Sequence, residues 1–112
     1  MKRIVIFGGT TEGRELAEAL AGKPLSLTVC VATEYGREEQ GELPGVEVHS
    51  GRLDAAAMAV LLKGADLCVD ATHPYAKEVS KNIRTACGSS GTPYRRLLRK
   101  TSPLPETAVK VD

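Results

Sequence analysis

The sequence predicts an α/β fold in which helices cover both faces of a parallel sheet. Short apolar runs rich in β-branched residues alternate with segments whose apolar residues recur at helical spacing. The first run, residues 3–7, has no polar alternation after Arg3, as expected of a parallel strand buried on both faces. Glycine or proline punctuates most junctions between the runs. A length of 112 residues is that of one domain.

Five strands are expected, at residues 3–7, 25–32, 46–49, 67–70 and 94–98. A polar loop, residues 33–45, separates the second strand from the third without a clear helix. Every other pair of consecutive strands is joined by a helical pattern. Right-handed crossovers then favour the strand order 3-2-1-4-5.

The first helix is expected between the first and second strands, and the second helix between the third and fourth strands. The first begins near Glu12 and is stopped by Gly22 and Pro24. Its apolar face consists of Leu16, Ala17, Leu20 and Ala21. The second begins after Asp54, a good N-cap, and ends near Gly64. It carries Met58, Leu61 and Leu62.

The third helix follows the fourth strand. Pro74 fits its first position, where the missing N–H costs nothing, and Gly88 and Gly91 are expected to end it. Its apolar stripe consists of Ala76, Val79, Ile83, Ala86 and Cys87. The regular pattern stops after Arg99, where two prolines indicate a linker over residues 99–112. The expected domain is therefore residues 1–98.

Composition excludes several classes of function. A net charge of +1 gives no basis for binding nucleic acid or a membrane surface, and one Phe, three Tyr and no Trp disfavour base stacking. The first apolar run is cut by Gly8 and is too short for a signal peptide, so a cytoplasmic location is expected. The three cysteines lack metal-ligand or CxxC spacing, so no metal site is expected.

A glycine-rich segment, residues 8–13, follows the first strand and opens a helix. It consists of Gly8, Gly9, Thr10, Thr11, Glu12 and Gly13. In that context glycines let the backbone approach phosphate oxygens at a helix N-terminus. Thr10 replaces the second glycine of G-x-G-x-x-G, and its hydroxyl and that of Thr11 are candidate phosphate donors. The alternative is a turn that only packs helix on strand.

Two later strand ends carry further candidate cofactor contacts. Glu34 suits a ribose 2′-OH, whereas Arg37 nearby suits the 2′-phosphate of NADP, and a solvated loop is the alternative. Arg52 follows the third strand and is either an anion ligand or a surface arginine.

Residues 72–75 place a hydroxyl, an imidazole and an aromatic ring at the end of the fourth strand, where open α/β sheets bind ligands. The candidate catalytic residues are Thr72, His73 and Tyr75. His73 suits a proton donor or a ligand-orienting group, and a capping or packing role is the alternative. The basic cluster that ends the fifth strand includes Arg96 and Arg99, and it is either an anion patch or a solvated strand end.

Four ordered motifs, residues 8–17, 32–36, 51–54 and 70–76, resemble those of the precorrin-6A and cobalt-precorrin-6A reductases. The resemblance covers nearly the whole chain to about Arg99. It implies a Rossmann-like three-layer domain and an NADPH-dependent oxidoreductase of cobalamin biosynthesis. Such enzymes transfer hydride to the precorrin-6A macrocycle and give precorrin-6B.

The resemblance also implies roles for named residues. Cofactor phosphates would lie on residues 8–13. Near the nucleotide would lie Thr33, Glu34, Tyr35, Gly36 and Arg52. Residues 72–75 would line the cleft near nicotinamide and substrate, and Arg96 and Arg99 would bind substrate carboxylates.

The end of the chain departs from the family pattern. Family members usually have a Glu-Arg-Pro-like end to the fifth strand, where this chain has residues 98–100, Leu-Arg-Lys. They also continue through a second domain, so this chain is expected to be the N-terminal half. A non-catalytic nucleotide-binding module is the rival interpretation. A short-chain dehydrogenase is disfavoured because the chain has no Tyr-x-x-x-Lys.

Overall fold

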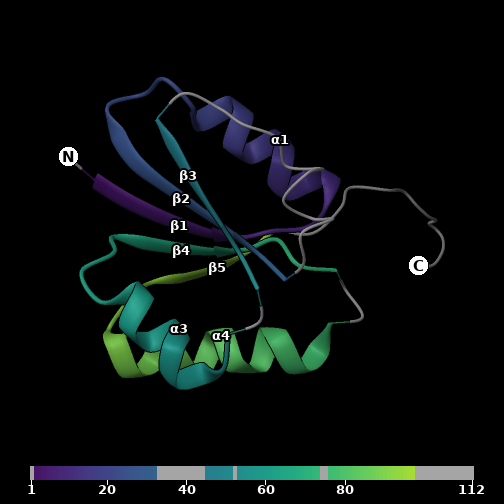
Figure 1. Cartoon of the computed structure of the whole chain (residues 1–112). Coiled ribbons are helices and arrows are strands. Elements are labelled where there is room, and N and C mark those ends of the chain that lie inside the picture. The colour runs from purple at the N-terminus through teal and green to yellow at the C-terminus, as the bar shows by residue number, and fades with distance from the viewer. Residues whose placement is uncertain (1, 33–44, 52, 74–75, 98–112) are drawn as a thin grey trace, which may run out of the picture.

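The computed structural model describes residues 2–32, 45–51, 53–73 and 76–97 (Figure 1). Five parallel strands form one sheet in the order β3-β2-β1-β4-β5, which confirms the predicted topology. The strands are β1 Lys2–Phe7, β2 Leu25–Val31, β3 Val46–Ser50, β4 Leu67–Asp70 and β5 Tyr94–Arg96. Phe7 at the end of β1 pairs with Cys30 of β2 and Asp70 of β4, so the three strands reach the same edge of the sheet.

Helices cover both faces of the sheet and complete the predicted three layers. Helix α1 (Thr11–Leu20) lies on one face, and α3 (Ala55–Leu62) and α4 (Lys77–Ser90) lie on the other (Figure 1). Because successive side chains of β1 point to opposite faces, Val5 and Phe7 pack with the α3 and α4 side. Ile6 packs in the core cluster that contains Ala17 of α1.

Local capping explains where the first two of these helices begin. The Thr10 side chain accepts a hydrogen bond from the Gly13 backbone N–H at 3.1 Å at the start of α1. Asp54 does the same for Ala57 at 2.8 Å at the start of α3, which confirms the predicted N-cap. Each cap satisfies an N–H that has no partner within the helix.

Helix α4 differs from its prediction in three respects. It begins at Lys77 after Ala76, which makes no side-chain cap bond, so the expected start at Pro74 is wrong. Gly88 lies inside the helix, which ends at Gly91 with φ 73°. Val79 is 36% exposed, and Ser80 is buried on the apolar face instead. The buried Ser80 hydroxyl has a polar partner, because it lies 3.3 Å from the Thr72 hydroxyl.

The expected small buried cysteines are confirmed: Cys30, Cys68 and Cys87 are free and buried. His49 lies on the edge strand β3, its side chain about half exposed, with Nε2 3.2 Å from Glu47 Oε2. No helix in the described ranges is long and apolar enough to cross a membrane. The predicted loop 33–45, apart from Gly45, and the predicted linker 99–112 lie outside the described residues.

Candidate functional site

The carboxyl edge of the sheet contains a topological switch point. After β1 the chain turns to α1 on one face, and after β4 it turns toward α4 on the other face (Figure 1). Strands β1 and β4 are neighbours, so the two segments leave adjacent strands toward opposite faces of the sheet. In open α/β sheets this is the position at which ligands bind.

The glycine-rich segment lies on the β1 side of this switch point. The Gly8 N–H donates to the Cys30 carbonyl at 2.8 Å, and Gly9 has φ 97°, a conformation that favours glycine. Gly13 is buried in the first turn of α1, and a Cβ there would lie 3.1 Å from Gly8 Cα and 3.4 Å from Ala71 Cβ. The helix therefore approaches β1 and β4 as closely as the third glycine of a dinucleotide fingerprint permits.

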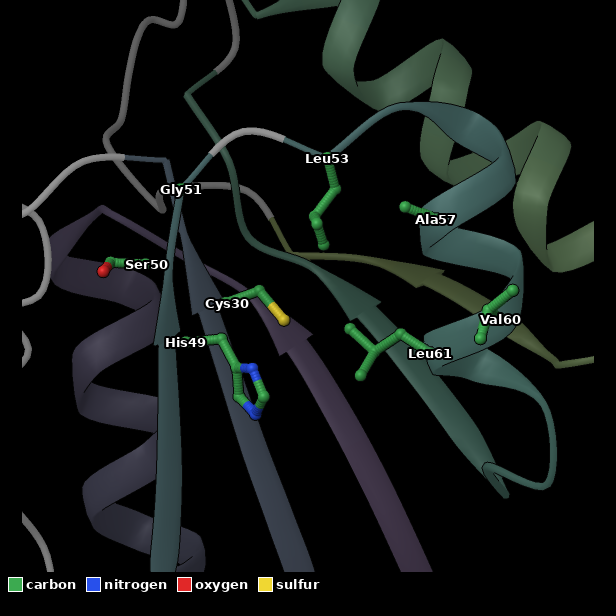
Figure 2. Close-up of a pocket in the computed structure, with 8 residues that line it drawn as sticks. All are labelled: Cys30, His49, Ser50, Gly51, Leu53, Ala57, Val60 and Leu61. Atoms are coloured by element: carbon green, nitrogen blue, oxygen red, sulfur yellow. The ribbon is translucent and has the colours of Figure 1, made fainter.

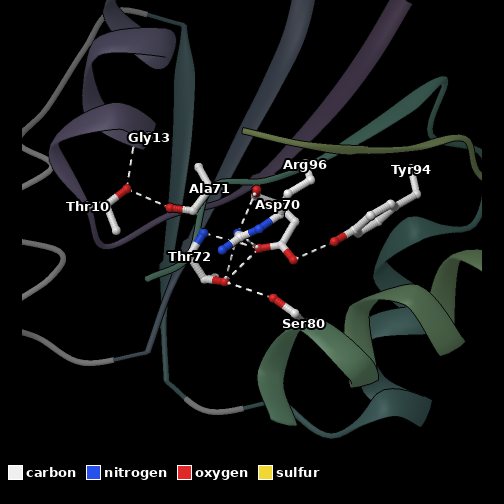
Figure 3. Close-up of polar contacts among 8 residues, drawn as sticks. All are labelled: Thr10, Gly13, Asp70, Ala71, Thr72, Ser80, Tyr94 and Arg96. Carbon is white, nitrogen blue, oxygen red and sulfur yellow. Dashed lines mark hydrogen bonds and ion pairs between the residues drawn. The ribbon is translucent and has the colours of Figure 1, made fainter. Parts of the chain in front are cut away.

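Thr10 has a structural role that its position in the motif did not reveal. Its hydroxyl donates to the Ala71 carbonyl at 2.6 Å while accepting from Gly13 (Figure 3). The single hydroxyl proton is thus directed at the end of β4 rather than at a phosphate. The first turn of α1 offers its backbone N–H groups and the positive end of the helix dipole, which are the features that bind anions at helix N-termini.

A cavity of about 220 Å³ lies along the same edge. Its lining residues come from the ends of β1, β2 and β4, from the start of α3 and from α4: Phe7, Gly8, Cys30, Val31, Ala32, Gly51, Leu53, Met58, Thr72, Glu78, Val79 and Asn82. Ligand pockets start at roughly 300 Å³. The cavity is therefore smaller than a typical ligand pocket, and its wall is largely apolar with few polar groups.

A second cavity of about 260 Å³ lies between β3 and α3 (Figure 2). Both Cys30 and His49 line it, which raises the question of a thiol–imidazole pair. Burial raises the pKa of Cys30 to about 12, so the thiol stays protonated at neutral pH. Leu53, Val60 and Leu61 supply much of the remaining lining, and the protonated Cys30 is not a thiolate nucleophile there.

Asp70, the last residue of β4, is the centre of a polar network (Figure 3). The Asp70 side chain is fully buried. Its Oδ1 accepts from the Thr72 hydroxyl at 2.6 Å, the Thr72 N–H at 3.1 Å and Arg96 Nη1 at 2.9 Å. Its Oδ2 accepts from the Tyr94 hydroxyl at 2.7 Å, and the Ser80 hydroxyl lies 3.3 Å from that of Thr72.

The network keeps Asp70 ionised although the residue is buried. Burial alone would raise the pKa of this carboxyl, but the hydrogen bonds from Ser80, Thr72 and Tyr94 outweigh it. The pKa of Asp70 is therefore lowered below its usual value of 3.8. Burial and the bond to Asp70 raise the pKa of Tyr94, so that side chain remains a protonated donor.

The network also defines what two predicted site residues offer. Thr72 directs its hydroxyl proton to a carboxylate, so in this arrangement the side chain presents lone pairs rather than an acidic proton. The Arg96 side chain is 23% exposed, and it forms an ion pair with Asp70 within the chain itself. His73 is exposed beside Thr72, and its carbonyl accepts from the Ala76 N–H at 2.9 Å.

The structure thus brings residues 8–13, 72–73 and 96 to one edge. The other predicted site residues lie outside the described ranges: Thr33, Glu34, Tyr35, Gly36, Arg52, Tyr75 and Arg99. Asp70 was not among the predicted site residues. The sequence did contain a signal for it, since a carboxylate ends an otherwise apolar four-residue strand. A charge buried there requires hydrogen-bond or ion-pair partners.

Comparison with known proteins agrees with this geometry. A model of the family described as precorrin-6x reductase CbiJ/CobK matches residues 3–112. A precorrin-6A reductase from Rhodococcus erythropolis is 38% identical over 109 residues, which are 94% of this chain and 43% of the relative. A cobalt-precorrin-6A reductase from Salmonella typhimurium is 35% identical over 98 residues, 86% of this chain and 37% of the relative.

A solved structure shows the same arrangement of elements. CobK precorrin-6A reductase superposes with a TM-score of 0.75 at 27% identity, covering 96% of this chain and 42% of that protein. The chain thus spans about two fifths of the length of the relatives it matches. A reductase family with this fold indicates a nicotinamide dinucleotide as the class of cofactor. On the match over residues 3–112 and the shared fold, the chain belongs to the precorrin-6x reductase family CbiJ/CobK.

Proposed function

We propose that this chain is the cofactor-binding part of an NADPH-dependent reductase of cobalamin biosynthesis. The substrate would be precorrin-6A or cobalt-precorrin-6A, and precorrin-6B would be the product of the former. The observation that carries the proposal is the turn at residues 8–13, closed against β1 and β4 by Gly13. A Cβ at Gly13 would disturb this cradle, so the residues present fit a bound pyrophosphate.

Each described part of the edge has a separate task in this proposal. The first turn of α1 holds the pyrophosphate, and the cavity beside Leu53 and Met58 takes an apolar part of the adenosine half. Residues 33–36 and Arg52 would contact the ribose and its 2′-phosphate. NADPH, when bound, supplies the hydride, and the protein supplies orientation and electrostatics.

Residues at the end of β4 and β5 would face nicotinamide and substrate. His73 is proposed to orient one of them, while Thr72 shapes the edge. Arg96 and Arg99 would contact carboxylates of the macrocycle. A second domain or chain would complete the cleft, and the cytoplasm remains the predicted location.

A non-catalytic nucleotide-binding module is the second candidate. It rests on the same described residues, because the glycine-rich segment and the cavity bear on nucleotide binding and not on hydride transfer. Both candidates require cofactor binding. They differ in whether the bound cofactor is oxidised when the macrocycle is added.

Titration of the purified chain with NADPH and with NADH tests the proposal directly. We expect saturable binding by calorimetry, with NADPH bound more tightly because the 2′-phosphate adds charge-assisted contacts. Absence of binding by either dinucleotide would contradict the cofactor-binding role. Adding precorrin-6A and following NADPH absorbance then separates the two candidates, since the non-catalytic module binds without oxidising NADPH.

A further inference from the structure

We propose that Asp70 is a positioning residue, whose carboxylate fixes the Arg96 guanidinium and the Thr72 backbone beside the nicotinamide half of the bound dinucleotide. The inference rests on the proposed function and assigns a role to a residue that touches neither cofactor nor substrate. It is carried by the hydrogen bonds that converge on this one side chain from Thr72, just after β4, and from Tyr94 and Arg96 of β5 (Figure 3).

The geometry leaves little freedom at the end of β4. Thr72 is bound to Asp70 Oδ1 through both its backbone N–H and its hydroxyl, just where the chain leaves the strand. On the opposite side, Thr10 of the glycine-rich segment donates to the Ala71 carbonyl. The backbone that leads into His73 is therefore tied on two sides, and the carboxylate supplies one of the ties.

Arg96 is oriented by the same carboxylate. Its Nη1 lies 2.9 Å from Asp70 Oδ1, 3.0 Å from the Asp70 carbonyl and 3.4 Å from the Thr72 hydroxyl. All three contacts use one nitrogen, which sets the direction of the rigid guanidinium plane. The remaining guanidinium N–H groups lie outside this network, and the pairing makes Arg96 a directed donor rather than a long-range positive charge.

The energetics argue against a role in stability alone. A buried ion pair contributes little net stability compared with a well-packed apolar residue, because both charges lose their hydration. Cys68, two positions earlier in β4, is also fully buried and meets the core with an uncharged side chain. A charge appears at the residue where the strand reaches the ligand edge, where directed contacts are useful.

The position of Asp70 and Arg96 in the sheet predicts which half of a bound dinucleotide loses contacts when the carboxylate is removed. The turn at residues 8–13 and the Leu53 end of the cavity lie toward β1, β2 and β3. Thr72 lines the same cavity from the end of β4, and Arg96 belongs to β5 at the other end of the sheet. Folds of this type bind the two nucleotides of a dinucleotide on the two sides of the switch point. Loss of the carboxylate should therefore affect the nicotinamide half selectively.

The test compares two ligands on one variant. NADPH and adenosine 2′,5′-bisphosphate, which lacks the nicotinamide half, are titrated into the wild-type chain and into Asp70→Asn. We expect the variant to bind NADPH about tenfold more weakly, the effect of one lost charge-assisted contact. Adenosine 2′,5′-bisphosphate should bind both proteins equally. Equal weakening of both ligands, or no weakening of NADPH, would overturn the positioning role.

Two further variants keep the test decisive if Asp70→Asn folds poorly. Arg96→Lys keeps the positive charge but loses the planar group, so it should reproduce the selective loss for NADPH; unchanged affinity would overturn the proposal. Tyr94→Phe is the matched control, because it removes another donor to the same carboxylate and leaves the Arg96 and Thr72 bonds in place. If the wild-type chain binds neither ligand, the proposed function itself fails, which is a different result from any selective outcome.

Discussion

At the scale of single residues, the hydroxyl of Thr10 joins two segments 61 positions apart in the chain. It caps α1 through Gly13 and holds the Ala71 carbonyl at the end of β4. The glycine-rich segment and the strand that leads to His73 are thereby joined through one side chain. The Thr10 hydroxyl links the start of α1 to the end of β4, and its proton is not directed at a phosphate.

Replacing Thr10 separates these roles. Thr10→Val keeps the shape but removes both hydrogen bonds, so we expect a loss of about 1 kcal/mol in the free energy of unfolding. Thr10→Ser keeps the hydroxyl and should lie within about 0.5 kcal/mol of wild type. Urea denaturation measures the free energy of unfolding of both variants. Equal stability of the two would contradict the structural role of the Thr10 hydroxyl.

The ionised state of Asp70 makes a prediction about acid stability. Because the folded-state pKa lies below the ordinary 3.8, ionised Asp70 stabilises the folded chain above that value. This contribution is lost as the pH falls below about 3.8 toward the folded-state pKa. Urea denaturation from pH 6 to pH 3 should therefore show a shallower acid loss for Asp70→Asn than for wild type. Parallel curves would show that the network does not favour the ionised carboxylate.

At the scale of elements, the packing of α1 depends on a missing side chain. A Cβ on Gly13 would press on the Gly8 backbone, whereas one on Gly88 in α4 meets nothing within 4 Å. Gly13→Ala should therefore destabilise the chain by about 1–3 kcal/mol and weaken NADPH binding. Gly88→Ala, the matched control, should stabilise it by about 0.5–1 kcal/mol, because alanine favours a helix interior. Urea denaturation distinguishes the two, and equal effects would contradict the close approach of α1.

The start of a helix can be predicted from the local sequence where a capping side chain is present, as in α3, but not where it is absent, as in α4. Asp54 reaches an N–H three residues ahead, so the start of α3 follows from the sequence nearby. The start of α4 has no such side chain at Ala76, and the segment before it is bound to Asp70 instead. Pro74 suits a first helical position by local rules, but the helix begins at Lys77.

At the scale of the whole molecule, the described sheet brings candidate ligand contacts together at its carboxyl edge. These are the glycine-rich segment, the segment after β4 and Arg96 of β5. The relatives extend well beyond the aligned region, since the chain covers 37% and 43% of two of them. We therefore expect cofactor binding to reside in this domain and substrate recognition to depend on further contacts.

The sequence by itself determined the order of elements, the parallel sheet and the glycine-rich turn at residues 8–13. Each of these follows from local patterns: apolar runs, helical spacing, and glycines between a strand and a helix. Only the tertiary structure decided how Thr10, Thr72 and Arg96 use their polar groups. Arg96 lies 26 positions from Asp70 in the chain, and no local pattern specifies a hydrogen bond between residues that meet only when neighbouring strands pair.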